Sequence, residues 1–132
     1  YLARYRVVDL FLDTLPYNAA TTASDALRMG LPVLTCQGRS FASRVASSVI
    51  NAVDLPELIT DTQEEYESLA IELATNPEKL KLIKDKLKSN LSTAPLYDTA
   101  KFTENLESAY RVMYERYHDG LGPDHIYIKN DR

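Results

Sequence analysis

Two short apolar runs, residues 7–12 and 32–36, flank a segment long enough to hold one helix. Each run is rich in β-branched and other large apolar residues, which is typical of a buried strand in a parallel sheet. From the start of the first run to the end of the second is about thirty residues, which is the size of one strand–helix–strand unit. The sequence therefore predicts a parallel βαβ unit near the N-terminus.

The segment between the two runs carries helix signals at both ends. Thr21 begins the expected helix, and Thr22 and Asp25 have the spacing of a capping box. Gly30 suits the position just past a helix end, and Pro32 follows where a helix cannot continue. A single crossover helix is expected here.

The rest of the chain continues the same pattern and then becomes helical. Ser40 is expected to cap a helix that runs to Asn51, and residues 58–60 form a third, short strand. Three helices follow, the last from about Thr99 to His118. Alternating strands and helices predict an α/β fold with a short parallel sheet, the size of half a Rossmann-like domain, followed by a helical C-terminal region.

Composition narrows the possible classes of protein. The length of 132 residues predicts a single domain spanning 1–132. The chain has 15 basic and 19 acidic side chains, and this excess of negative charge disfavours a nucleic-acid binder. Cys36 is the only cysteine, which excludes an internal disulfide and a cysteine zinc cluster. His118 and His125 do not suggest a metal site, because the sequence offers no third ligand at metal-binding spacing. No apolar run has the length of a membrane span. Because no Met opens the chain, we expect a piece of a longer protein.

The start of the first crossover helix is a candidate anion site. In open α/β sheets, ligands bind beyond the carboxyl ends of the strands, where the amides of Thr21 and Thr22 and their hydroxyls are expected. Asp25, one turn further, is suited to accept hydrogen bonds from ribose hydroxyls. The chain has no glycine-rich dinucleotide fingerprint and no P-loop. On spacing alone, the same residues are also explained as an ordinary helix cap.

Five segments carry a family resemblance in the same order along the chain. They are residues 9–18, 21–27, 30–35, 43–47 and the ending at 120–125. Together they resemble the protein O-GlcNAc transferase and SPINDLY family over nearly the whole chain. The resemblance implies part of the second Rossmann-like half of a GT-B glycosyltransferase, which holds the nucleotide.

The resemblance also implies an activity and partners. Members of that family transfer N-acetylglucosamine from UDP-GlcNAc to Ser or Thr of acceptor proteins, and the SPINDLY branch uses GDP-fucose. By the match, Thr21 and Thr22 contact the diphosphate, Asp25 the ribose and Arg4 the region of the base. No metal or other cofactor is implied. The partners implied are the upstream tetratricopeptide repeats and first Rossmann-like half of the same chain, and the location is cytoplasmic.

Two departures from the family pattern fall near the expected nucleotide, and a further one, Arg28-Met29 in place of Trp-Ala, precedes the helix-ending glycine. Ala20 stands where the family has a histidine before the paired threonines, and Tyr1 replaces another family histidine near the base. The catalytic groups of the family lie upstream, so the chain alone is expected to be inactive. The alternative is a degenerate, non-catalytic module that keeps the fold for protein interaction. An exposed sheet edge predicts self-association into a homodimer.

Overall fold

The computed structural model describes residues 1–128, which fall into two compact units, Tyr1–Leu96 and the residues from Tyr97 onward. The expectation of one domain over residues 1–132 stays a prediction, because compactness alone does not establish which parts fold independently.

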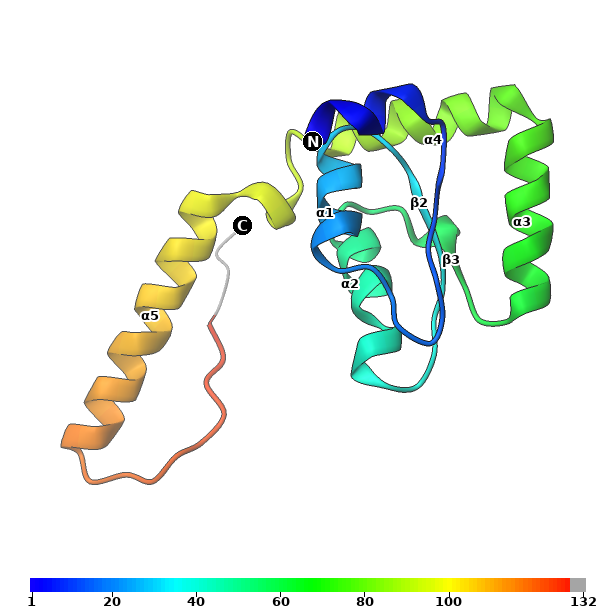
Figure 1. The fold of residues 1–132 in the computed structure, drawn as a ribbon. Coiled ribbons are helices and arrows are strands. Elements are labelled where there is room, and N and C mark those ends of the chain that lie inside the picture. Colours follow the sequence, from blue (N-terminus) through cyan, green and yellow to red (C-terminus); the bar gives the residue numbers. More distant parts are fainter. Residues whose placement is uncertain (129–132) are drawn as a thin grey trace. The chain divides into compact units, whose positions relative to one another are not determined.

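The first unit is built on a three-stranded parallel sheet (Figure 1). The strands are β1 (Phe11–Leu12), β2 (Val33–Cys36) and β3 (Ile59–Thr60), in the order β1-β2-β3. The pairing is staggered, since the first half of β2 pairs with β1 and its second half pairs with β3. The α/β class and the short parallel sheet predicted from the sequence are confirmed.

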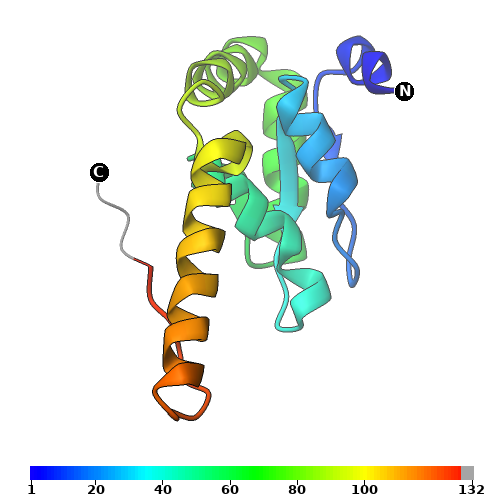
Figure 2. The same cartoon turned by 90° about the vertical axis from the view of Figure 1, so that its left-hand side faces the viewer.

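Helices cover both faces of this sheet (Figures 1 and 2). The crossover helices α1 (Thr21–Arg28) and α2 (Val45–Ala52) lie on one face, and α3 (Gln63–Thr75) lies on the other. The helix α4 (Pro77–Asn90) packs against α3. Four short 3₁₀ helices are also present: η1 (Leu2–Val7) precedes β1, η2 (Phe41–Ser43) and η3 (Pro56–Leu58) lie on either side of α2, and η4 (Pro95–Tyr97) follows α4.

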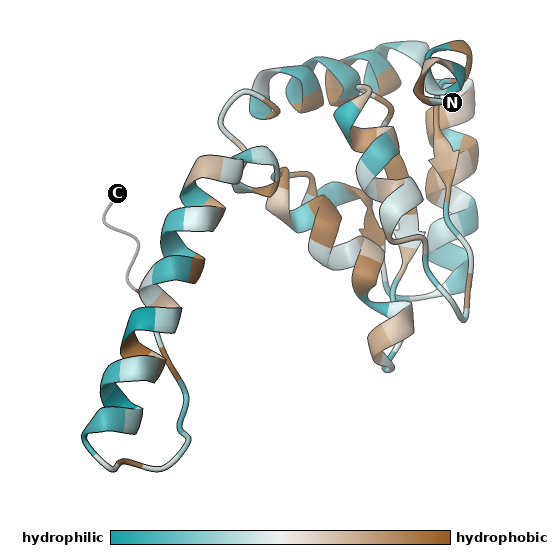
Figure 3. Ribbon diagram, turned by 60° about the vertical axis from the view of Figure 1, so that its left-hand side comes forward, coloured by the Kyte–Doolittle hydropathy of each residue, from teal (hydrophilic) through white to brown (hydrophobic). Residues whose placement is uncertain are grey.

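The core of the first unit lies between β2 and the helices on its two faces. All four residues of β2 are buried, as expected for the central strand of a covered parallel sheet. Figure 3 shows the strands mostly hydrophobic, whereas α4 carries both hydrophilic and hydrophobic residues along its length. The largest fully buried apolar side chains are Leu27, Val33, Leu34, Ile50, Val53, Leu55, Leu58, Leu73 and Leu87.

Local signals set several helix ends. The Ser40 side chain accepts from the Ser43 amide in a capping box, as the sequence predicts, although the helix it starts is η2 rather than α2. Asn76 caps α4, and Pro77 occupies its first turn. Gly30 follows α1 with φ of +81°, a left-handed conformation that glycine adopts without steric cost.

Two local expectations were wrong. The apolar run 7–12 contributes only Phe11–Leu12 to the sheet, and Val7 ends η1 with 83% of its surface exposed. The reason is the stagger, since only two residues of β2 pair with β1. The capping box expected at Thr22 and Asp25 is absent. Both residues lie inside α1, which begins at Thr21, and no side chain caps this helix.

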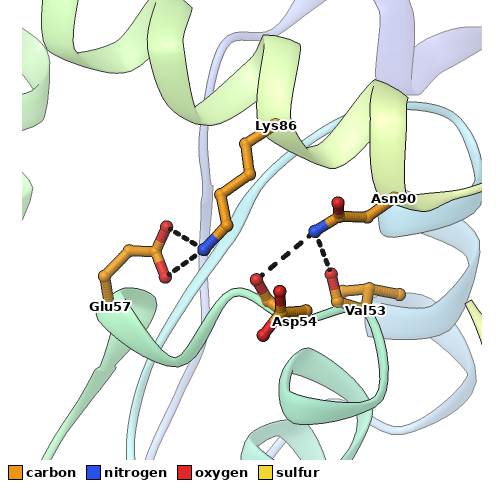
Figure 4. Close-up of polar contacts among 5 residues, drawn as sticks. All are labelled: Val53, Asp54, Glu57, Lys86 and Asn90. Carbon is orange, nitrogen blue, oxygen red and sulfur yellow. Dashed lines mark hydrogen bonds and ion pairs between the residues drawn. The ribbon is translucent and has the colours of Figure 1, made fainter.

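The C-terminal end of α4 is tied to the connection between α2 and β3 (Figure 4). The Asn90 side-chain amide donates to the carbonyl oxygens of Val53 (2.9 Å) and Asp54 (3.4 Å). One turn earlier, Lys86 forms an ion pair with Glu57 at 2.9 Å. These contacts fix α4 against the end of α2.

The second unit consists of α5 (Thr99–His118) and the segment that follows it. The bounds of α5 agree with those predicted from the sequence. The Asp98 carboxylate accepts a hydrogen bond from the Lys101 amide and so caps the first turn of α5. After the helix, the chain is held by a hydrogen bond from the Arg116 guanidinium to the Gly122 carbonyl (2.8 Å). Within residues 1–128, no helix is long and apolar enough to cross a bilayer.

Candidate functional site

The residues that follow the three strands meet at one edge of the sheet, because all three strands are parallel. Asp13 follows β1, Gln37 follows β2 and Asp61 follows β3. The Gln37 side-chain amide donates to the Asp61 carboxylate at 2.7 Å, which connects the last two loops. Thr21 and Thr22, two of the residues that the sequence predicts for binding, begin the helix that follows the first of these loops.

Asp13 is the most buried charged residue at this edge, with 6% of its surface exposed. One carboxylate oxygen accepts from the Ala19 amide at 2.7 Å, and the other accepts from the Thr35 hydroxyl at 2.6 Å. The Tyr66 hydroxyl donates to the Asp13 carbonyl at 2.8 Å. Burial raises the pKa of Tyr66, and the charges of Asp13 and Cys36 raise it further.

The loop between β1 and α1 is fixed at its far end by Asn18, which is 1% exposed. Its backbone amide donates to the Ala42 carbonyl at 2.8 Å, and its side-chain amide donates to the Thr14 carbonyl at 2.9 Å. The side-chain oxygen of Asn18 is buried and has no hydrogen-bond partner within residues 1–128. The loop is therefore held by side chains that lie beneath it.

The N-terminus of α1 opens onto a hollow of about 330 Å³. The first amides of α1 have no intrahelical partner, as at the start of any helix, and Ala20, which precedes the helix, supplies no side-chain cap for them. Thr21 and Thr22 are exposed. The hollow is lined by Phe11, Leu12, Asp13, Thr14, Tyr17, Asn18, Ala19, Ala20 and Thr22.

The structure brings the other two predicted residues near the same helix but not into the hollow. Asp25 is half-buried one turn along α1, and Arg4 is exposed on η1, which packs against α1. The neighbouring Tyr5 has its pKa raised to about 12, first by the hydrogen bond of its hydroxyl to that of Tyr1 at 2.9 Å. Burial and the charges of Tyr1 and Asp25 raise it further. Tyr5 thus lies within electrostatic reach of Asp25.

Three residues of this site were not predicted from the sequence: Asn18, Tyr5 and Tyr66. Asn18 and Tyr66 contact residues of other loops or strands, so no local pattern identifies them. Asp13 was not singled out from the sequence either. Its position directly after a strand was the one signal that pointed to it.

No part of residues 1–128 gathers three or more potential metal ligands of the His, Cys, Asp or Glu types. His118 and His125 are exposed, and their rings contact those of Tyr114 and Tyr127 respectively. Cys36 is buried in β2, as the sequence predicts.

A family comparison matches residues 1–106 to the model described as Glycosyl transferase family 41. The chain belongs to glycosyl transferase family 41. The O-GlcNAc transferase and SPINDLY resemblance drawn from the sequence is therefore confirmed.

Individual relatives of this family 41 chain agree with that assignment. A probable UDP-N-acetylglucosamine–peptide N-acetylglucosaminyltransferase SPINDLY from Petunia hybrida is 39% identical over 123 residues, 93% of this chain and 13% of that protein. The corresponding transferase of Caenorhabditis elegans is 34% identical over 96% of this chain and 11% of its own length. The family 41 chain thus spans about an eighth of the curated relatives it matches.

A solved structure shows the same fold. A mutant of the Thermobaculum terrenum O-GlcNAc transferase matches with a TM-score of 0.78 and 41% identity, covering 86% of this chain and 22% of that protein. The short parallel sheet of the family 41 chain is therefore part of a glycosyltransferase fold.

Proposed function

We propose that this chain supplies the donor-binding end of a glycosyltransferase that moves N-acetylglucosamine from UDP-GlcNAc to Ser or Thr side chains of proteins. The observation that carries the proposal is the uncapped N-terminus of α1, which faces a hollow at the carboxyl edge of the sheet. The names of the relatives support the donor and the acceptor class.

The proposed chemistry at α1 is electrostatic. Free amides and the helix dipole at an N-terminus favour a negatively charged group such as a diphosphate. The diphosphate is the leaving group of the transfer, so its negative charge grows in the transition state, and fixed donors stabilise it there. Thr21 and Thr22 are proposed to bind the diphosphate through their amides and hydroxyls.

The sugar and base contacts are assigned to the neighbouring residues. Asp25 is proposed to accept hydrogen bonds from the ribose hydroxyls, since it lies half-buried one turn along α1 from the two threonines. Arg4 is proposed to lie on the base side, since η1 packs against α1. No metal or cofactor is part of the proposed reaction. Residues outside this chain are proposed to supply catalysis, so the chain alone is inactive.

Titration with nucleotides tests the donor site. We expect UDP to shift the amide resonances of Thr21, Thr22 and Asp25, and GDP to bind more weakly. Thr22→Ala should weaken binding of UDP about tenfold, the loss of roughly 1.4 kcal/mol that one charge-assisted hydrogen bond contributes. The matched control is Thr99→Ala, since Thr99 is the first residue of α5, a helix whose N-terminus Asp98 caps. Equal effects of both substitutions on binding contradict the donor site.

A second candidate is a non-catalytic module that retains the fold for protein interaction. Ala20 favours it, because a methyl group supplies no hydrogen bond where the family resemblance expects a histidine. Ala20→His in the full-length protein separates the two candidates. A gain in affinity for UDP supports the transferase, whereas an unchanged affinity together with no detectable transfer supports the interaction module.

Further partners and the location also belong to the proposal. The acceptor protein, upstream tetratricopeptide repeats and a first Rossmann-like half of the same protein are proposed to complete the enzyme in the cytoplasm. The chain by itself is proposed to form a homodimer, since Leu12 on the edge strand β1 is 54% exposed. Sedimentation of this chain as a monomer at all concentrations contradicts the dimer.

A further inference from the structure

We propose that Asp13 is a positioning residue that holds the first turn of α1, and with it the diphosphate-binding amides, in register with the sheet. The inference rests on the donor site proposed above. It assigns a role to a buried carboxylate to which the proposed donor site gives no contact with the diphosphate or the sugar.

The geometry of Asp13 connects two elements. Its side chain accepts from the Thr35 hydroxyl of β2 at 2.6 Å and from the Ala19 amide at 2.7 Å. Thr35 is fully buried in the central strand, so it offers a fixed donor. Ala19 lies two residues before Thr21, the first residue of α1. The carboxylate therefore joins the centre of the sheet to the start of the helix.

Neighbouring bonds hold Asp13 itself in place. The Tyr66 hydroxyl of α3 donates to the Asp13 carbonyl at 2.8 Å. The Thr60 hydroxyl of β3 donates to the Thr35 carbonyl at 3.0 Å, which extends the network to the third strand. In addition to the backbone pairing of β1, side-chain hydrogen bonds thus connect the loop before α1 to β2, to α3 and, through Thr35, to β3.

This arrangement affects binding of the diphosphate, because a helix N-terminus binds an anion only if its amides point toward that anion. Even a small displacement of these amides weakens their hydrogen bonds to the anion. The loop between residues 14 and 17 is exposed and offers little packing of its own. The Asp13 carboxylate and Asn18 are therefore the two buried side chains that hold the entry to α1.

Two substitutions at Asp13 separate position from charge. Asp13→Ala removes both acceptors and frees the Ala19 amide. Asp13→Asn keeps one oxygen for the Ala19 amide, and its NH₂ group can donate to the Thr35 hydroxyl, which accepts as well as donates. A positioning role predicts that the asparagine variant rescues most of what the alanine variant loses.

The experiment measures UDP binding by calorimetry and amide hydrogen exchange in the full-length protein. We expect Asp13→Ala to weaken UDP binding at least about tenfold and to accelerate exchange of the Ala19 amide, and Asp13→Asn to stay within about threefold of wild type. Leu87→Ala, a core substitution in α4, is the control for general loss of stability. If it weakens UDP binding as much as Asp13→Ala at the same folded fraction, the proposal is overturned.

A second pair of variants keeps the test decisive if Asp13→Ala does not fold. Thr35→Val removes only the donor to Asp13, and Thr35→Ser restores it. Weaker UDP binding in the valine variant with recovery in the serine variant supports the proposal, and equal binding in both overturns it. The positioning role alone fails if UDP binding is weakened by Thr22→Ala but by none of the Asp13 and Thr35 variants. If wild type does not bind UDP, the donor site fails and the positioning role falls with it.

Discussion

The Asn90 side-chain amide at the end of α4 donates to the Val53 carbonyl at the end of α2, at 2.9 Å and across 37 positions of sequence. Val53 is buried, so its carbonyl has little access to water. The adjacent ion pair between Lys86 and Glu57 is different, because both side chains are 40% exposed. An exposed pair of this kind contributes little to stability. The hydrogen bond of Asn90 therefore contributes more to holding α4 at the end of α2 than the ion pair does.

Substitution of Asn90 tests that contact. Asn90→Ala should lower the free energy of unfolding by about 1 kcal/mol, because a buried carbonyl loses its donor while alanine slightly favours the helix. Urea denaturation of the wild type and the variant measures the difference. Ser89→Ala, on the exposed side of the same helix turn, is the control and should change stability by less than about 0.5 kcal/mol. Equal losses in both variants contradict the assignment.

Asp54 has a φ of +56°, a left-handed conformation that a β-branched residue tolerates poorly. Asp54→Val should therefore destabilise the protein by about 1–2 kcal/mol, whereas Asp54→Asn should be nearly neutral, since asparagine adopts this conformation readily. The midpoint of urea denaturation reports both. A valine variant as stable as the asparagine variant shows that the turn rearranges without strain.

Leucines on opposite sides of α4 should respond differently to the same truncation. Leu87 is fully buried, whereas Leu82 is 70% exposed. Leu87→Ala should cost about 2–5 kcal/mol of unfolding free energy through lost burial and a residual cavity. Leu82→Ala should cost less than about 0.5 kcal/mol. Thermal and urea denaturation compare the pair, and similar losses contradict the orientation of α4.

Tyr66 predicts a dependence of stability on alkaline pH. Its pKa in the folded protein is raised above the ordinary value of 10.0, first by burial. The unfolded chain therefore loses the phenol proton at lower pH than the folded one. The stability that Tyr66 contributes is fully present below pH 10 and is lost as pH rises through the folded pKa. Unfolding free energies between pH 8 and 11 should fall more steeply for wild type than for Tyr66→Phe, and parallel curves contradict this.

Elements with strong local signals were predicted well from the sequence. The apolar periodicity from about Thr99 to His118 gives α5 its correct bounds, and Asn76 and Pro77 are equally local signals for the start of α4. In these cases, the proline, the cap or the periodicity fixes the boundary with no help from distant residues. The central strand was also recognised, because a fully buried strand reads as a continuous apolar run.

The start of the first strand and the network around Asp13 were not predicted, because both depend on register. Val7 and Val8 have the composition of a strand, but of residues 7–12 only Phe11 and Leu12 pair with β2. The contact between Asp13 and Tyr66 spans 53 positions, so no local pattern contains it. The candidate binding residues Thr21, Thr22, Asp25 and Arg4 came from helix position and family resemblance.

The stagger of the sheet also limits where the chain can change length. Leu12 pairs with Leu34, so the next residue, Asp13, lies opposite Thr35, and both side chains point to the same face. Deleting or inserting one residue between Phe11 and Asp13 turns the carboxylate to the other face and breaks its bond to Thr35. The exposed tip at residues 14–17 carries no such restriction. Insertions and deletions in this family should therefore accumulate at the tip and stop at Asp13.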